Sequence, residues 1–210
     1  MLTVATKTAL RQELKKASQQ GLSIGLVPTM GNLHQGHLEL VEASVRECQF
    51  TAATIFVNPM QFGADEDLAI YPRTLEQDQQ LLECAGCNLL FTPGASEVYG
   101  PELESGTVVR IPRLSEAYCG KSRPGHFDGV ATIVTKLFNL VAPAKAYFGL
   151  KDFQQFRIIQ QLVEDLDFDL ELRGIPTKRE ASGLAMSSRN NFLTADQRKI
   201  AAGLYATLKS

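Results

Sequence analysis

The chain has 210 residues, which is enough for one well-packed domain, or for a domain and part of a second. Hydrophobic residues make up 44%, and 21 Lys and Arg face 23 Asp and Glu, for a formal net charge of -2. This balance gives no basic excess for nucleic acid or for a membrane surface. The N-terminus lacks the apolar core of a signal peptide, and no stretch approaches the roughly 20 apolar residues of a membrane span. We expect a cytoplasmic protein.

Candidate strands alternate with helical patterns along the chain. The strands are short apolar or β-branched runs, at residues 23–28, 50–58, 88–93, 107–112, 144–149 and 169–177. Amphipathic helical patterns fall between them, at residues 37–45, 74–86, 129–143 and 153–166. Alternation of this kind is typical of right-handed βαβ units. The sequence therefore predicts an α/β fold, with a Rossmann-like, doubly wound parallel sheet.

Two of the three histidines follow the first of these central strands. His34 and His37 lie three residues apart around Gly36, where a helix is predicted to begin. A turn between a strand and a helix start offers free backbone N–H groups and a positive dipole end to an anion. A capping role, or a metal-binding His pair, is the alternative, but no further cluster with ligand spacing lies nearby. The pattern favours a phosphate site for a nucleotide, with no protein-held metal.

Cys84 and Cys87 have the spacing of a redox or zinc pair. No second pair completes a metal site, and the two cysteines stand where a predicted helix should end at Gly86. We interpret this segment as a helix terminus with reduced thiols, as expected in the cytosol.

Ligands of doubly wound sheets bind beyond the carboxyl ends of the strands. Four loops that follow predicted strands carry polar residues there, at 28–37, 57–63, 148–155 and 175–190. Neither the dinucleotide pattern G-x-G-x-x-G nor the P-loop pattern occurs, so the phosphates need another kind of cradle.

Six segments, in this order, resemble the pantothenate synthetase (pantoate–β-alanine ligase, AMP-forming) family. They read VPTMGNLHQGHLELV, IFVNPMQFG, YPRTLEQD, SRPGHFDGVATIVTKLFNLV, YFGLKDFQQ and GLAMSSRNNFL. The resemblance covers the chain to at least Leu193, and it places the chain in the nucleotidyltransferase superfamily. Residues 34–37 then resemble the HIGH-type motif, and residues 186–189 resemble the KMSKS-type loop.

The resemblance implies a two-step ligation in a homodimeric enzyme. The carboxylate of (R)-pantoate attacks the α-phosphorus of ATP, which releases pyrophosphate and leaves pantoyl adenylate. The amine of β-alanine then attacks the activated carbonyl and releases AMP. A carboxylate and a phosphate repel each other, so the site has to neutralise charge and hold both in line, with Mg²⁺ assisting.

The resemblance also assigns site residues. Catalytic roles fall on His34, His37, Lys151 and Arg189, with His37 in the family's proton-donor role. The residues assigned to ATP are Met30, Gly31, Asn32, Leu33, His34, Gln35, Gly36, His37, Gly149, Leu150, Lys151, Asp152, Lys178, Met186, Ser187, Ser188 and Arg189. The residues assigned to the other substrates are Gln61 (pantoate and β-alanine), Gln155 (pantoate), Asn58 and Tyr71. Arg123 and His126 match the family too, but ordering of their loop explains them equally well.

Three departures from the family pattern stand out. Leu150 replaces the usual Glu, Lys178 replaces an apolar residue near the adenine, and family members continue for several tens of residues past Ser210. We therefore expect an ATP- and pantoate-binding domain at 1–176, and a hinge with an incomplete C-terminal lid domain at 177–210. Two alternatives stay open: another nucleotidyltransferase, which would need more Arg or Lys for a phosphorylated substrate, or a fragment that binds nucleotide without turnover.

Overall fold

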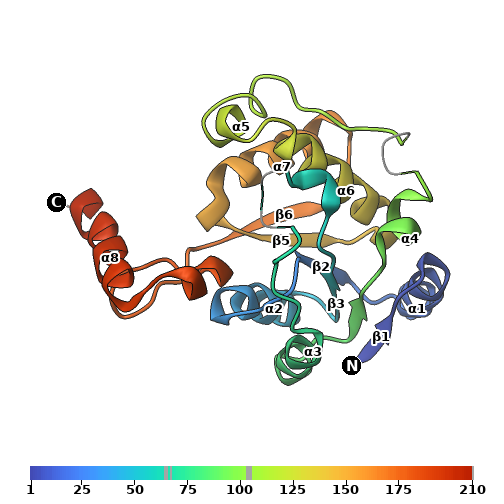
Figure 1. Cartoon of the computed structure of the whole chain (residues 1–210). Coiled ribbons are helices and arrows are strands. Elements are labelled where there is room, and N and C mark those ends of the chain that lie inside the picture. Colours follow the sequence, from blue (N-terminus) through green and yellow to red (C-terminus); the bar gives the residue numbers. More distant parts are fainter. Residues whose placement is uncertain (64–65, 67, 103–105, 210) are drawn as a thin grey trace.

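The centre of the protein is a six-stranded sheet in which every strand is parallel to its neighbours (Figure 1). The computed structural model describes residues 1–63, 66, 68–102 and 106–209. The strands lie in the order β1-β4-β3-β2-β5-β6. Their bounds are β1 Leu2–Val4, β2 Ile24–Thr29, β3 Phe50–Ile55, β4 Leu89–Phe91, β5 Lys145–Gly149 and β6 Glu171–Ile175. The predicted α/β fold with a doubly wound parallel sheet is confirmed.

The strand order reverses direction at β2. From β2 the sheet extends through β3 and β4 on one side, and through β5 and β6 on the other. Connections that diverge from two adjacent strands leave a crevice beyond their carboxyl ends, and ligands of this fold class bind there. The crevice lies between the loop after Thr29 and the loop after Gly149.

Helices cover both faces of the sheet. Their bounds are α1 Lys7–Gln19, α2 Gln35–Glu47, α3 Leu75–Cys84, α4 Ala95–Tyr99, α5 Cys119–Ser122, α6 His126–Val141, α7 Phe153–Asp165 and α8 Ala195–Lys209. The described residues also include the short 3-10 turns η1 Pro59–Gln61, η3 Leu150–Asp152 and η4 Ser188–Phe192. The buried residues of α1, α6 and α7 form one core with the sheet, and those of α2 and α3 form a second.

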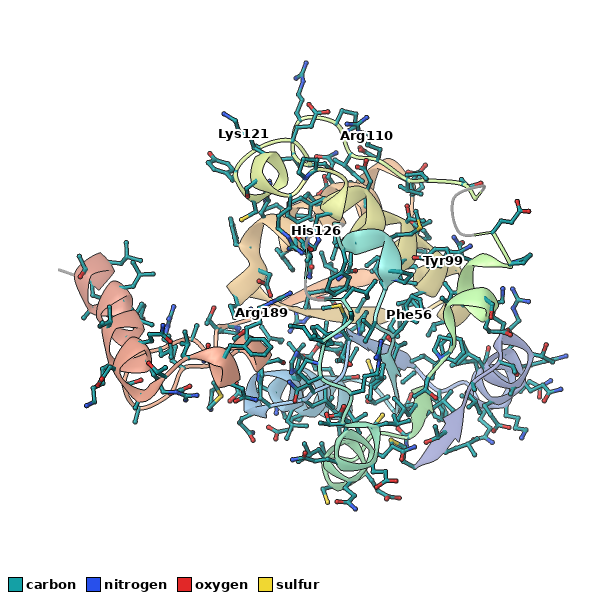
Figure 2. The ribbon with its side chains drawn as sticks, viewed as in Figure 1. Phe56, Tyr99, Arg110, Lys121, His126 and Arg189 are labelled. Carbon is teal, nitrogen blue, oxygen red and sulfur yellow. The ribbon has the colours of Figure 1, made fainter. Side chains whose placement is uncertain are left out.

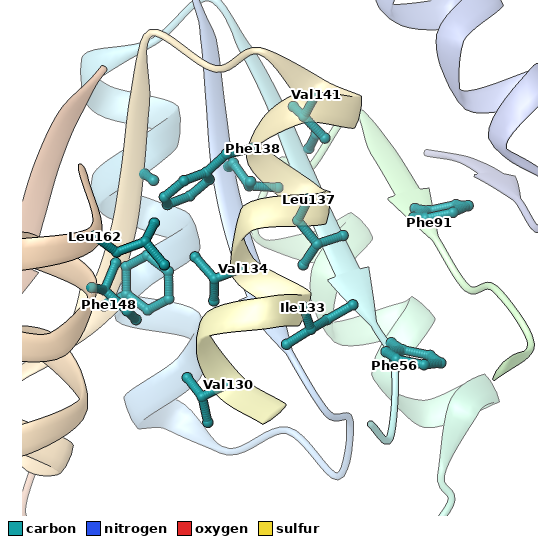
Figure 3. Packing of buried hydrophobic residues seen from close by; sticks show 14 of the residues in the cluster. Phe56, Phe91, Val130, Ile133, Val134, Leu137, Phe138, Val141, Phe148 and Leu162 are labelled. Atoms are coloured by element: carbon teal, nitrogen blue, oxygen red, sulfur yellow. The ribbon is translucent and has the colours of Figure 1, made fainter. Parts of the chain in front are cut away.

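Helix α6 supplies much of the larger core (Figure 3). Its apolar residues recur at helical spacing, and the buried ones include Val130, Ile133, Val134, Leu137, Phe138 and Val141. They pack with Phe148 of β5 and Leu162 of α7. Burying an aliphatic side chain of this size stabilises a fold by about 1.5–3 kcal/mol, so this one helix anchors the sheet.

One predicted strand is wrong. Residues 107–112 form no strand, because the N–H of Val109 donates to Thr132 Oγ1 of α6 at 2.9 Å instead of to a neighbouring strand. Val109 and Ile111 still pack against the larger core, which explains the apolar pattern. The sequence patterns did not include β1, which has only 3 residues, or α1, although α1 is amphipathic and buries Leu10, Leu14 and Ala17.

The interpretation of Cys84 and Cys87 as a helix terminus is confirmed. Helix α3 ends at Cys84, and Gly86 follows with a left-handed φ of +85° that suits glycine. The two thiols are not bonded to each other, and burial raises the pKa of Cys87 to about 11.

Helix α8 stands away from the sheet (Figure 1). Its apolar Ile200, Leu204 and Leu208 are exposed. Because β6 ends at Ile175 and the chain then leaves the sheet, we propose the domain boundary at residues 176 and 177. Among the described residues, none of the helices has the length and apolar character required to cross a lipid bilayer.

Candidate active site

The turn between β2 and α2 has an unusual backbone. Gly31 and Asn32 follow each other with left-handed φ values of +83° and +50°. Glycine adopts this conformation freely, and asparagine does so more readily than other residues. The two residues reverse the chain so that His34 caps α2 and the helix begins at Gln35.

Each of the two histidines accepts a backbone hydrogen bond at its Nδ1 atom. His34 Nδ1 accepts from the N–H of Gly36 at 3.1 Å, and His37 Nδ1 accepts from the N–H of His34 at 3.3 Å. The rings lie 4.1 Å apart between their centroids. An imidazole nitrogen that accepts a hydrogen bond carries no proton, so each neutral ring holds its proton on Nε2. The pair therefore offers two N–H donors.

Both histidines are held neutral. Burial lowers the pKa of His37 to about 3, and the neighbouring His34 and Lys151 contribute to this lowering. Burial and then Lys151 also lower the pKa of His34. Near neutral pH the pair therefore contributes oriented hydrogen bonds, while the positive charge of the site comes from lysine and arginine.

A branched cleft opens at the crevice between β2 and β5. It consists of three connected cavities of about 170, 120 and 140 Å³, which share His37, Asp152 and Gln155 in their linings. The first cavity has an apolar wall from α6, formed by Val130, Ile133, Val134 and Leu137. A larger cavity of about 460 Å³ is lined by Gly31, Thr74 and Asp78 among others, and none of its lining residues in the described part of the chain is a histidine or a glutamine.

The first cavity holds Gln61 above the apolar wall. Its Nε2 donates to Met30 Sδ at 3.0 Å, and its Oε1 accepts from Asn58 Nδ2 at 3.1 Å. Asn58 is 1% exposed, and its amide also bonds the carbonyl of Gly129, the N–H of Met60 and the hydroxyl of Tyr99. Asn58 therefore has little capacity left for a ligand and orients Gln61 instead.

Gln155 reaches the same cleft from α7. Its side-chain amide has no hydrogen-bond partner within the described part of the chain, so both its donor and its acceptor are open to a ligand. The preceding residue differs: Gln154 Nε2 donates to the carbonyls of Leu114 and Ala117, at 2.8 and 2.7 Å. Of these adjacent glutamines, Gln155 faces the cleft and Gln154 holds the loop at residues 114–117.

Helix α6 can approach η1 closely because residue 129 is glycine. A Cβ at Gly129 would lie 2.3 Å from the carbonyl oxygen of Met60 and 2.7 Å from the backbone nitrogen of Gln61. Both are backbone atoms, which cannot move aside as a flexible side chain would. The absence of a side chain at Gly129 therefore determines how close Gln61 lies to α6 in the cleft.

Arg123 and His126 also form hydrogen bonds to the segment that contains Gln61. Arg123 donates to both carboxylate oxygens of Glu66, at 2.6 and 2.7 Å, and its Nη1 lies 3.0 Å from His126 Nε2. His126 Nδ1 donates to the carbonyl of Gln61 at 2.7 Å, because a carbonyl only accepts. Burial lowers the pKa of His126, consistent with a neutral ring that accepts from Arg123. These residues order the loop and also line the third cavity.

The segment before α8 closes the cleft over the histidine turn. Ser188 Oγ donates to the carbonyl of Asn32 at 2.9 Å, which joins the KMSKS-type segment to the HIGH-type turn. Arg189 from η4 and His126 from α6 line the same cavity (Figure 2). Across the cleft, Lys151 forms an ion pair with Asp152 at 3.0 Å.

Lys178 lies at the edge of the second cavity, where it forms an ion pair with Glu39 of α2. Its carbonyl accepts from the N–H of Met186 at 2.9 Å. The ion pair with Glu39 directs the ammonium of Lys178 to the surface of α2, while the aliphatic part of the side chain borders the cavity. The lysine is therefore accommodated without an unpaired charge.

The structure brings together most of the residues that the sequence assigned to ligands. Those that line the cleft are Met30, His34, Gly36, His37, Asn58, Gln61, Tyr71, Gly149, Lys151, Asp152, Gln155, Lys178, Met186, Ser187, Ser188 and Arg189. Five others lie outside it. Gly31 lines the separate cavity, Asn32 forms the turn, Leu33 is in the core, Gln35 is exposed and Leu150 packs toward Gly174.

Sequence reasoning missed the apolar wall from α6. Its residues have the same spacing as any core-facing stripe, so no signal in the sequence separates wall from core. Pro28 and Phe148 at the strand ends also line the cleft. Their positions follow from the rule on strand ends once the sheet order is known.

A parallel sheet whose switch point carries a turn leading into a helix start is the architecture of nucleotide-binding α/β proteins. The sequence model described as Pantoate-beta-alanine ligase matches residues 2–210, and the chain belongs to this family. It is 55% identical to a pantothenate synthetase from Chromohalobacter salexigens over 208 residues, which are 99% of this chain and 74% of that one. It is 53% identical over 210 residues to the enzyme from Ectopseudomonas mendocina, covering all of this chain and 74% of that one.

Solved structures are similar as well. A crystal structure of pantothenate synthetase from Thermus thermophilus superposes with a TM-score of 0.94 at 48% identity, covering all of this chain and 74% of that one. A pantoate-beta-alanine ligase from Francisella tularensis superposes with a TM-score of 0.92 at 36% identity, covering all of this chain and 80% of that one. The Francisella structure is described as complexed with beta-gamma ATP and beta-alanine.

Proposed function

We propose that this chain condenses (R)-pantoate with β-alanine and ATP, giving pantothenate, AMP and pyrophosphate through pantoyl adenylate. One observation carries the proposal: a single cleft joins the turn of His34 and His37 to two glutamine amides and an apolar wall. Membership of the ligase family supports it, as does the similar Francisella structure with beta-gamma ATP and beta-alanine.

In the first step the carboxylate of pantoate attacks the α-phosphorus of ATP. The new bond joins a carboxylate oxygen to phosphorus, and the bond to the pyrophosphate oxygen breaks. His34 and His37 donate hydrogen bonds from Nε2 to phosphate oxygens, where negative charge builds up. Lys151 and Arg189 supply the positive charge, because both histidines stay neutral. The proton-donor role expected of His37 thus becomes hydrogen-bond donation.

Pantoate binds between the glutamines and the wall. Its hydroxyls and carboxylate bond the amides of Gln61 and Gln155, and its two methyl groups lie on the apolar side of α6. Tyr71 borders the third cavity on the Gln61 side. Because η1 is held by Asn58 and by the close approach at Gly129, the amide of Gln61 is positioned before substrate arrives.

In the second step the amine of β-alanine attacks the carbonyl carbon of the adenylate. A carbon–nitrogen bond forms, the bond from that carbon to the phosphate oxygen breaks, AMP leaves, and the nitrogen gives up a proton to the solvent. Gln61 serves β-alanine as well as pantoate, since it lines both the first and the third cavity. The segment with Ser187 and Ser188 covers the phosphates and limits the access of water to the mixed anhydride.

Mg²⁺ fits this cleft as an ion carried by the triphosphate. Protein-bound Mg²⁺ commonly uses one or two carboxylates plus substrate phosphates, and among the described residues Asp152 is the carboxylate that lines all three cavities. No group of three or more His, Cys, Asp or Glu within the described ranges could hold a metal alone. When bound, the ion would neutralise phosphate charge. We further propose a cytoplasmic homodimer.

The test is the dependence of pyrophosphate release on each substrate. With purified protein, ATP and Mg²⁺, we expect release to require pantoate, and pantothenate to form with AMP only after β-alanine is added. Release that needs a phosphorylated co-substrate in place of pantoate would favour another nucleotidyltransferase. ATP binding without release would mean that the chain binds nucleotide without turnover.

A further inference from the structure

Asp78 lies behind the histidine turn and outside the cleft. It belongs to the first turn of α3 and is 1% exposed. The segment YPRTLEQD that contains it carries the family resemblance, but none of the roles above uses this carboxylate. A buried carboxylate is costly unless its oxygens are hydrogen-bonded, so its partners indicate its purpose.

The partners of Asp78 are the backbone of the turn. Oδ2 accepts from the N–H of Asn32 at 2.8 Å, and Oδ1 accepts from the N–H of Leu33 at 2.8 Å. Thr74 Oγ1 also donates to Oδ2, at 3.1 Å. No ion pair of the described residues includes Asp78, so two backbone N–H groups, one hydroxyl and the positive end of α3 balance its charge.

These two bonds hold the left-handed part of the turn. The N–H groups of Asn32 and Leu33 both point at one carboxylate only because Gly31 and Asn32 have positive φ. A carboxylate with two oxygens can bridge two consecutive N–H groups, and no neutral side chain of this size offers two such acceptors. Asp78 therefore selects this backbone conformation over the extended alternatives.

The conformation of the turn also positions His37 of the HIGH-type motif and Ser188 of the KMSKS-type segment. The next N–H along the chain, that of His34, donates to His37 Nδ1 and so keeps the proton of His37 on Nε2. On the other side, the carbonyl of Asn32 accepts from Ser188 of the KMSKS-type segment. We propose that Asp78 is a positioning residue for adenylate formation: it fixes the turn that sets the His37 tautomer and docks Ser188. The catalytic part of this inference rests on the proposed function.

The test replaces Asp78 by Asn, which keeps the shape but turns one acceptor into a donor facing a backbone N–H. Glu97→Gln is the matched control, because Glu97 also lies in the first turn of a helix and accepts from a backbone N–H, that of Lys7, at 2.8 Å. The chain has three histidines, so the ¹⁵N signals of their rings can be assigned by comparing single variants.

We expect the wild-type protein to show an unprotonated Nδ1 and a protonated Nε2 at His37. Asp78→Asn should lose this fixed pattern, and its kcat for pantoate-dependent pyrophosphate release should fall about 10²-fold while KM for ATP changes little. Glu97→Gln should keep both. If Asp78→Asn does not fold, Thr74→Val, which removes one of the three donors, should shift the His37 signals in the same direction with a smaller loss of rate.

Wild-type rate and ring signals in folded Asp78→Asn would overturn the inference. So would a loss of rate with unchanged ring signals, because Asp78 would then act on a substrate or an ion directly. An equal loss in Glu97→Gln, or unchanged signals in Thr74→Val, would also overturn it. The ring signals are read without substrates, so a wild-type protein that releases no pyrophosphate would refute the proposed function and leave this test standing.

Discussion

The polar side chains at the two ends of strand β5 differ in whether their partners lie within the protein. At its amino end, Lys145 forms ion pairs with Glu47 and Glu171, and Arg173 of β6 pairs with the same two carboxylates. At its carboxyl end, the strand leads to the cleft, where histidines are neutral and the amide of Gln155 is open. The amino end has neutralised its charges internally, and the carboxyl end keeps donors for a ligand. The contrast locates function without any reference to family.

The largest expected effect is at His37. His37→Ala removes one Nε2–H donor from the phosphates, and loss of a single such donor costs about 10²–10³-fold in kcat. Initial rates of pantoate-dependent pyrophosphate release measure this. Arg173→Gln, at the other end of the sheet, is the control and should retain its rate. Near-normal pyrophosphate release by a folded His37→Ala protein would contradict the assignment of function to the carboxyl end of β5.

Next in size is the loss of either ligand amide. Gln61→Ala and Gln155→Ala leave substrate groups unpaired in the cleft, a loss of about 1–3 kcal/mol, or roughly 5–150-fold in the KM for pantoate. ATP binding should change little. Gln154→Ala is the matched control, because that amide bonds loop carbonyls outside the cleft. Weakened ATP binding with intact pantoate binding would contradict the assignment.

Stability should depend on pH through His37. The unfolded chain takes up a proton there below about pH 6.5, whereas the folded protein holds the ring neutral down to about pH 3. The unfolded state therefore binds one more proton at this ring in the window, and folding stability is lost as the pH falls, by about 1.4 kcal/mol per pH unit. His37→Gln, whose amide oxygen can accept the same backbone bond, should flatten that slope in urea unfolding. An unchanged slope would mean that His37 is protonated in the folded state.

The smallest effect is expected at the amino end. Glu47→Gln weakens two partly exposed ion pairs, and pairs at a solvated surface contribute little to stability. Urea unfolding should therefore shift slightly, and the shift should shrink in high salt. The kinetic constants should match those of the wild type. A changed KM for ATP, pantoate or β-alanine would show that the two ends are coupled through β5.

The fold was predictable from the sequence because strands and helices of this kind have distinct periods. Residues 107–112 were misleading, because a chain that packs against a helix can be as apolar as a strand. The position of His34 and His37 was predictable, since a strand, a turn and a helix start are local features. The role of Asp78 was not, because 45 and 46 residues separate it from the two N–H groups that it holds. Nor was the tautomer of His37, which depends on a single backbone bond.

The neutral histidine pair has a consequence for the heat of nucleotide binding. Each ring already carries its one proton on Nε2, and the pKa of each ring is lowered. The cleft can therefore accept a triphosphate near neutral pH without taking a proton from the solvent. The calorimetric enthalpy of ATP binding should then be the same in buffers of large and small ionisation enthalpy. The cleft recognises phosphate with two ring N–H dipoles that are oriented before the ligand arrives, and His37 stays neutral under modest acidification of the surroundings.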